Sequence, residues 1–180
     1  MKIHGLDYSM TSPAMCSWDP STTFSWENVD SCYMTGSKKF AVSVGRCSGT
    51  LHGGYESQEQ RFHEIAEFFS SRMSPGDLVA MEGYAFGAKG LVFHIGECGG
   101  IIKNRMWANG IRFEVVPPTA LKKHATGKGN SDKSGMNDAF VSLTGYDVRT
   151  ALGCTEKQWN PSSDVVDAFF LCSYARTLFL

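Results

Sequence analysis

The pattern of apolar and polar residues predicts three strands in the first quarter of the chain. Residues 1–8 (MKIHGLDY) form an extended segment in which Ile3 and Leu6 interrupt small and polar residues. Residues 31–36 (SCYMTG) and 38–46 (KKFAVSVGR) predict two more strands across a turn that contains glycine, so the three strands should form an antiparallel meander. The intervening residues 10–29 are rich in Ser, Thr and Pro and predict a long loop.

Residues 57–72 (SQEQRFHEIAEFFSSR) carry the clearest helical pattern. Ser57 and Gln60 have the spacing of a capping box, which marks the start of a helix. An apolar stripe with helical spacing follows at Phe62, Ile65, Ala66 and Phe69. The segment is therefore predicted to be an amphipathic helix with one buried face.

The second half of the chain alternates strand and helix patterns. The run LVAM is typical of a buried strand, and Glu82 follows at its C-terminal end. Beyond it the sequence predicts a helix at about 87–108, a strand at 111–116, a proline-started helix from 117, a helix at about 132–145 and a last helix from 162. This order defines an α/β fold around a mixed sheet, and 180 residues suit a single domain over 1–180.

The composition narrows the class of protein. Hydrophobic residues make up 42% and charged residues 19%, which excludes a largely disordered chain. No apolar run is long enough to span a membrane and the N-terminus lacks a signal-peptide core, so we expect a cytoplasmic protein. The six cysteines form no CxxC pair and the five histidines no HxxxH, which argues against zinc and for reduced, buried thiols.

The distribution of charge is uneven although the net charge is only −1. Residues 103–133 hold seven Lys and Arg against Glu114 and Asp132, so this segment is strongly basic and the remainder is acidic. A basic segment of this kind is typical of a phosphate-binding patch, and a solvated charged face is the alternative.

The last helix carries two aspartates at its start, in the stretch SSDVVDAFFL. Asp164 and Asp167 are three residues apart, so they share one helix face among apolar residues. Ser162 or Ser163 can cap this helix, and the helix dipole favours an aspartate in the first turn. Asp167 lies further in, so it needs a lysine, a shared proton or a metal ion to neutralise it.

Four acids stand out by position: Asp7 near the end of the first strand, Glu82 at the end of the fourth, and the pair Asp164 and Asp167. Sites in α/β proteins assemble at the carboxyl ends of neighbouring strands. Acids meeting there need cations, and oxygen ligands select Mg²⁺ or Mn²⁺, two of which can promote phosphodiester hydrolysis. Taken singly, Asp7 can instead be a turn residue, Glu82 a lysine partner and Asp164 a helix-start acid.

The chain resembles the RuvC-type Holliday-junction resolvases of the RNase H-like superfamily in an ordered set of motifs. These are GLDYS with Asp7, VAMEG with Glu82, GECGGII, VVPPTALKKHATGKGNSDK, and SSDVVDAFF with Asp164 and Asp167. The segment TGKGNSDK is the most specific, because it is similar to the family's TGxGxAxK. The resemblance implies an RNase H-like α/β fold, with a central mixed five-stranded sheet flanked by helices.

The same resemblance implies a Mg²⁺-dependent endonuclease of DNA recombination and repair that makes paired nicks in a four-way junction. The four acids would be its catalytic metal ligands, holding two Mg²⁺ per active site, with Mn²⁺ able to substitute. Lys122 and Lys133 match family lysines that lie close to the DNA, with Lys123 and Lys128 as neighbours. The protein would be a homodimer, with the glycine-containing helix at 87–108 at or near the interface.

The chain departs from the family pattern directly after the catalytic glutamate. The family often places an aromatic wedge there to hold the junction open, and this sequence reads EGYAF, with Ala85 at that place. Tyr84 or Phe86 can make the DNA contact instead, and the alternative is that both are core residues. The pI near 6.5 and the 10–29 loop favour a compact, phage-encoded member acting in the host cytoplasm.

Other functions are compatible with the same residues. One is a broader nuclease of this fold that cuts branched or flapped DNA, and another is a non-catalytic module that binds branched DNA. A pure binder has no need of four acids facing a polyanion. An actin-like ATP-binding protein is disfavoured, because it needs glycine-rich phosphate loops and two subdomains.

Overall fold

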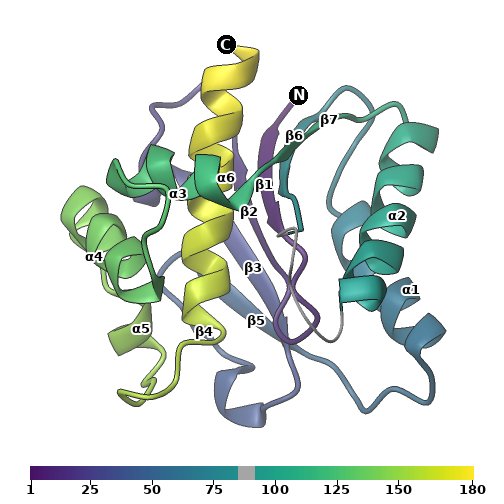
Figure 1. The fold of residues 1–180 in the computed structure, drawn as a ribbon, viewed down its shortest axis with the longest axis horizontal. Coiled ribbons are helices and arrows are strands. Elements are labelled where there is room, and N and C mark those ends of the chain that lie inside the picture. The colour runs from purple at the N-terminus through teal and green to yellow at the C-terminus, as the bar shows by residue number, and fades with distance from the viewer. Residues whose placement is uncertain (85–91) are drawn as a thin grey trace.

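A mixed sheet, seven-stranded over the residues that the structure describes, organises the chain (Figure 1). The computed structural model describes residues 1–84 and 92–180. The strands run in the spatial order β4-β5-β3-β2-β1-β6-β7, and β1 pairs antiparallel with β2 and parallel with β6. Their bounds are β1 (Ile3–Asp7), β2 (Ala14–Trp18), β3 (Val29–Thr35), β4 (Ser43–Val44), β5 (Cys47–Leu51), β6 (Leu78–Glu82) and β7 (Arg112–Val116).

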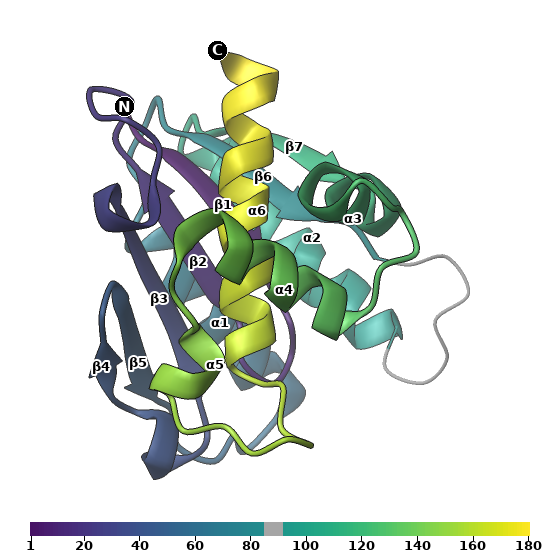
Figure 2. The same cartoon turned by 90° about the vertical axis from the view of Figure 1, so that its left-hand side faces the viewer.

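Helices cover both faces of this sheet (Figures 1 and 2). On one face lie α1 (Gln58–Ser70) and α2 (Val92–Ala108); on the other lie α3 (Pro118–Thr126), α4 (Lys133–Thr144), α5 (Val148–Ala151) and α6 (Ser162–Phe179). None of the helices in the described part of the chain is long and apolar enough to cross a membrane.

The predicted helix at 57–72 is confirmed as α1. The Ser57 side chain accepts a hydrogen bond from the Gln60 N–H at 3.1 Å, as a capping box requires. The Gln60 side chain turns back and accepts from the Glu56 N–H at 2.7 Å. The predicted apolar stripe is buried, so cap and stripe together set this helix on the sheet.

The predicted strand count and the predicted meander are both wrong. The sheet has seven strands rather than five, and residues 10–29 contain β2. Because β2 lies between β1 and β3 under helices, four of its five residues are buried and it lacks the polar alternation of a half-exposed strand. Residues 38–46 form a 3₁₀ turn and the two-residue β4, so the meander is β1, β2 and β3.

The predicted serine cap of the last helix is also wrong. Ser162 is already the first residue of α6, Pro161 stands at the cap position, and no side chain caps the helix. The Ser162 hydroxyl instead donates backward to the Trp159 carbonyl at 2.6 Å.

Strand alternation sends Asp7 and Glu82 to the face that α6 covers. Ile3 on β1, together with Leu78 and Ala80 on β6, packs in the core beneath α3 to α6. Since successive side chains alternate between faces, positions 7 and 82 continue this series. The two strands are parallel and adjacent, so both carboxylates emerge at the same edge of the sheet.

Gly5 lets α6 lie directly on β1. A Cβ at this position would come within 2.1 Å of the Ala168 carbonyl oxygen and 2.2 Å of the Cys172 nitrogen. Asp164 lies four residues before Ala168, which is about 6 Å along the helix. Asp7 lies two residues after Gly5, which is about 6.6 Å along the strand, so the two acids are offset from the contact by similar distances. The contact at Gly5 therefore sets the start of α6 beside the end of β1.

Candidate active site

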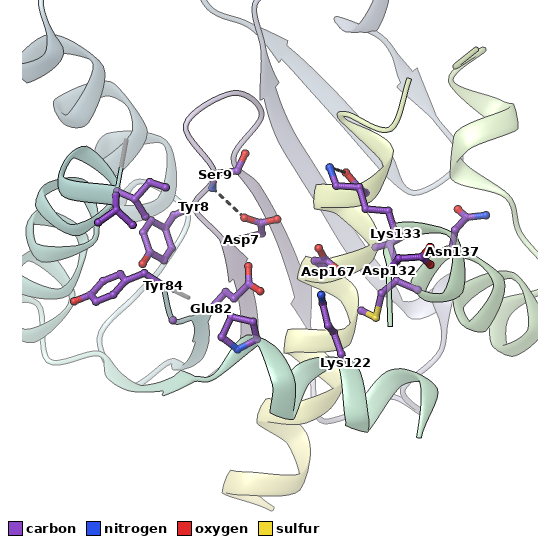
Figure 3. Close-up of a pocket in the computed structure, with 17 residues that line it drawn as sticks. Asp7, Tyr8, Ser9, Glu82, Tyr84, Lys122, Asp132, Lys133, Asn137 and Asp167 are labelled. Atoms are coloured by element: carbon purple, nitrogen blue, oxygen red, sulfur yellow. Dashed lines mark hydrogen bonds between the residues drawn. The ribbon is translucent and has the colours of Figure 1, made fainter. Parts of the chain in front are cut away.

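A cavity of about 360 Å³ opens where the start of α6 crosses the carboxyl ends of β1 and β6 (Figure 3). The first turns of α2, α3 and α4 complete its wall. The lining residues are Asp7, Tyr8, Ser9, Glu82, Gly83, Tyr84, Val92, Ile95, Pro118, Lys122, Asp132, Lys133, Met136, Asn137, Ser163, Val166 and Asp167.

Three of the four predicted acids, Asp7, Glu82 and Asp167, line this cavity (Figure 3). Asp164 is not among the lining residues and is only 5% exposed. Its Oδ2 accepts hydrogen bonds from the Ser12 hydroxyl and the Asn160 amide. Across residues 1–84 and 92–180, no three Asp, Glu, His or Cys side chains are close enough to hold a metal ion as placed. The fold thus gathers the acids at one place without closing them into a metal cage.

Burial raises the pKa of all four acids, and repulsion by neighbouring acids adds to the shift for Asp7, Glu82 and Asp167. Burial is the largest cause for Asp7, whose pKa lies well above its usual range, and the charges of the other three acids add to it. The pKa of Asp167 is raised for the same reasons, although two lysines oppose the shift. Burial raises the pKa of Glu82 to about 7 and that of Asp164 to about 6. In the metal-free protein, protons therefore neutralise part of this charge.

Two of the four predicted DNA-binding lysines, Lys122 on α3 and Lys133 at the start of α4, line the cavity (Figure 3). The Lys133 Nζ donates to the Asn160 Oδ1 at 3.0 Å. Lys123 and Lys128 are exposed and lie outside the lining. Lys122 and Lys133 therefore lie in the same cavity as the acids, whereas Lys123 and Lys128 lie on the surrounding surface.

Of the two aromatic candidates, Tyr84 lines the cavity and is 39% exposed, so it is not a core residue. Its hydroxyl accepts a hydrogen bond from the Lys103 Nζ at 3.4 Å. Phe86, the other predicted DNA contact, lies outside the described residues.

The chemistry of the cavity fits a hard divalent cation such as Mg²⁺. Its metal-ligating groups, among the described lining residues, are carboxylates, with no imidazole or thiolate. Oxygen donors of this kind select Mg²⁺ or Mn²⁺ over softer metals. A bound cation would also offset the repulsion that contributes to the raised pKa values of Asp7, Glu82 and Asp167, so the carboxylate ligands and the electrostatics both favour such a cation.

Sequence reasoning missed three residues that hold the acids. The Ser9 N–H donates to the Asp7 Oδ1 at 3.0 Å, and Ser12 and Asn160 hold Asp164. Ser12 lay in the predicted loop, and 152 residues separate it from Asp164. No local pattern signals such a contact, because the fold alone brings these residues together.

Fold and cavity together define an α/β protein with acids and lysines at the carboxyl ends of its central strands. The solved structures to which it is similar include Thermus thermophilus RuvC, with 18% identity over 98% of this chain and 96% of that one and a TM-score of 0.58. The structure of T. thermophilus RuvC in complex with a Holliday junction substrate is 16% identical over 98% of this chain and 96% of that chain, with a TM-score of 0.59. A Fowlpox virus resolvase in complex with its substrate Holliday junction DNA is 15% identical over 100% of both chains, with a TM-score of 0.56.

No protein-family model and no curated protein sequence matches the chain. The likeness to the solved structures shows the fold, which is that of the RuvC-type resolvases, and the predicted fold class is confirmed.

Proposed function

We propose that the protein is a structure-selective DNA endonuclease that resolves four-way junctions by paired nicks. The observation that carries this proposal is the convergence of Asp7, Glu82 and Asp167, from three separate elements, on one cavity beside Lys122 and Lys133. The fold adds support, because two structures that share it are complexes with Holliday junction DNA.

We assign Asp7, Glu82, Asp164 and Asp167 to the binding of two Mg²⁺ ions, for which Mn²⁺ can substitute. When bound, the metal would activate the attacking water and stabilise the leaving oxygen of the scissile phosphate. The four crowded carboxylates supply the negative charge for this role, and their burial limits screening by bulk water.

The remaining cavity residues are suited to grip the DNA. Lys122 and Lys133 offer point charges to phosphate oxygens beside the acids, and Lys123 and Lys128 extend the basic surface outward. The exposed ring of Tyr84 can stack on an unpaired base at the junction centre.

We further propose that two copies pair through α2, which gives the molecule two active sites. Phe93, Gly100 and Trp107 are seven residues apart and so follow one stripe of the helix. Phe93 is 80% exposed and Trp107 76%, and a Cβ at Gly100 would meet nothing within 4 Å. Bare backbone between two aromatic rings can receive a ring of a second copy across a two-fold axis.

Light scattering on a sizing column tests this pairing. The double variant Phe93→Ser, Trp107→Ser should be monomeric, while the wild type and Leu143→Ser stay dimeric. Leu143 is a matched control because it is 64% exposed on α4. A monomeric wild type at working concentrations would refute the dimer.

The function itself is tested with end-labelled four-way junctions beside linear duplex and flap DNA of the same sequence. Wild type, Asp167→Asn and the exposed-site control Asp138→Asn are compared in Mg²⁺ and in EDTA. We expect symmetric paired nicks at the junction, lost in EDTA and in Asp167→Asn but kept in Asp138→Asn. Asp167→Asn should still fold and bind junctions, because it removes a ligand and a buried repulsion together.

The other outcomes separate the alternatives. Binding without metal-dependent cutting would make the protein a branched-DNA-binding module. Equal cutting of all three substrates would support the nuclease activity but not the junction selectivity, and would make the protein a broader branched-DNA or flap nuclease.

A further inference from the structure

Asn160 lies between the carboxylate of Asp164 and the ammonium group of Lys133. Its Nδ2 donates to the Asp164 Oδ2 at 2.7 Å and to the Ser12 Oγ at 3.0 Å. Its Oδ1 accepts from the Lys133 Nζ at 3.0 Å and from the Ser163 Oγ at 3.4 Å. A carboxylate needs a donor and an ammonium group needs an acceptor, so these partners fix the orientation of the amide.

Ser12 holds the same oxygen of Asp164. Its hydroxyl donates to the Asp164 Oδ2, and Ser12 is only 3% exposed. Two donors, one from the segment between β1 and β2 and one from the segment before α6, thus satisfy a single carboxylate oxygen. The Asp164 side chain also forms a hydrogen bond with the side chain of Asp7.

Asp164 also lies next to Asp7. After burial, the charge of Asp164 is the largest cause of the raised pKa of Asp7. The Asp164 carboxylate is therefore held by Ser12 and Asn160 while it remains beside Asp7, an acid that lines the cavity.

We propose that Ser12 and Asn160 are positioning residues of the metal site. By holding the Oδ2 of Asp164, they leave its Oδ1 available to a cation that Asp7 also binds. The inference rests on the proposed function, because it takes Asp164 as a metal ligand. In metalloproteins, outer hydrogen bonds of this kind orient the ligand, and their loss typically costs roughly 10–100-fold in metal affinity.

The test is a titration of the DNA-free protein with Mn²⁺, in which electron paramagnetic resonance measures the concentration of the free ion. Ser12→Ala and Asn160→Ala should each bind Mn²⁺ roughly 10–100-fold more weakly than the wild type. Thr11→Ala and Gln158→Ala are matched controls that should bind Mn²⁺ like the wild type. Thr11 and Gln158 line the neighbouring cavity with Ser12 and Asn160, and their side chains bond to no described residue.

Thermal unfolding in EDTA separates positioning from folding. A variant that unfolds cooperatively yet loses Mn²⁺ affinity supports the proposal, and a folded variant with wild-type affinity overturns it. Should Asn160→Ala fail to fold, Ser12→Ala alone decides, because it removes one hydroxyl and leaves the Lys133 contact intact.

Asp164→Asn distinguishes this inference from the proposed function. If Asp164→Asn loses Mn²⁺ while Ser12→Ala and Asn160→Ala keep it, only the positioning role fails. If Asp164→Asn itself binds Mn²⁺ like the wild type, the metal role of Asp164 in the proposed function fails as well.

Discussion

Replacing Glu82 by glutamine is expected to stabilise the metal-free protein at alkaline pH. Burial raises the pKa of Glu82 from its usual 4.5 to about 7, so the folded protein keeps a proton that the unfolded chain releases. A carboxyl group whose pKa is raised by folding makes its full contribution to the free energy of unfolding below pH 4.5. That contribution is lost as the pH rises through 7. At about 1.4 kcal/mol per pH unit between those values, the wild type loses about 3 kcal/mol that Glu82→Gln retains.

Urea unfolding in EDTA at pH 5 and pH 8 measures this difference. The two proteins should be close in stability at pH 5, and Glu82→Gln should be more stable by about 3 kcal/mol at pH 8. In a chain of this size that corresponds to a rise in melting temperature of roughly 6–12 °C. Glu114→Gln is the control, because Glu114 is exposed on the neighbouring strand β7.

Equal stability of wild type and Glu82→Gln at both pH values would refute the reasoning. It would mean that Glu82 is solvated in the folded protein, and that the cavity does not concentrate negative charge.

Two further predictions follow from the packing and the charges. Gly5→Ala should destabilise the protein by about 3 kcal/mol or more and abolish cleavage, because the new Cβ meets the backbone of α6 at Ala168; unchanged urea unfolding would contradict this. Lys122→Gln and Lys133→Gln should each weaken junction binding and lower the slope of log affinity against log salt by about one, as a salt titration measures. Lys157→Gln, outside the acid-lined cavity, should leave that slope as it is.

Local signals in the sequence were enough for the elements that carry the site. The capping box and stripe of α1, the buried run of β6 and the proline start of α3 all lie within a few residues of the feature they predict. The same holds for the two acids of α6, whose shared face follows from helix geometry. These features depend on neighbours in the chain, so the sequence shows them directly.

The strands that the sequence missed are those whose pattern is set by remote neighbours. β2 is buried because β1, β3 and α6 surround it, and β5 exists because it pairs in parallel with β3. In both cases the hydrogen-bond partners come from elsewhere in the chain. A local hydrophobic pattern carries little of that information.

The sequence by itself determined which residues are acidic, which lie at strand ends and which share a helix face. Only the tertiary structure decided that Asp167 faces the cavity while Asp164 turns to Ser12 and Asn160. The physical reason is the contact at Gly5, which fixes where α6 meets β1 and so which partner each carboxylate can reach. Residues 152 positions apart become hydrogen-bonded through that contact, and no pattern within one segment can encode it.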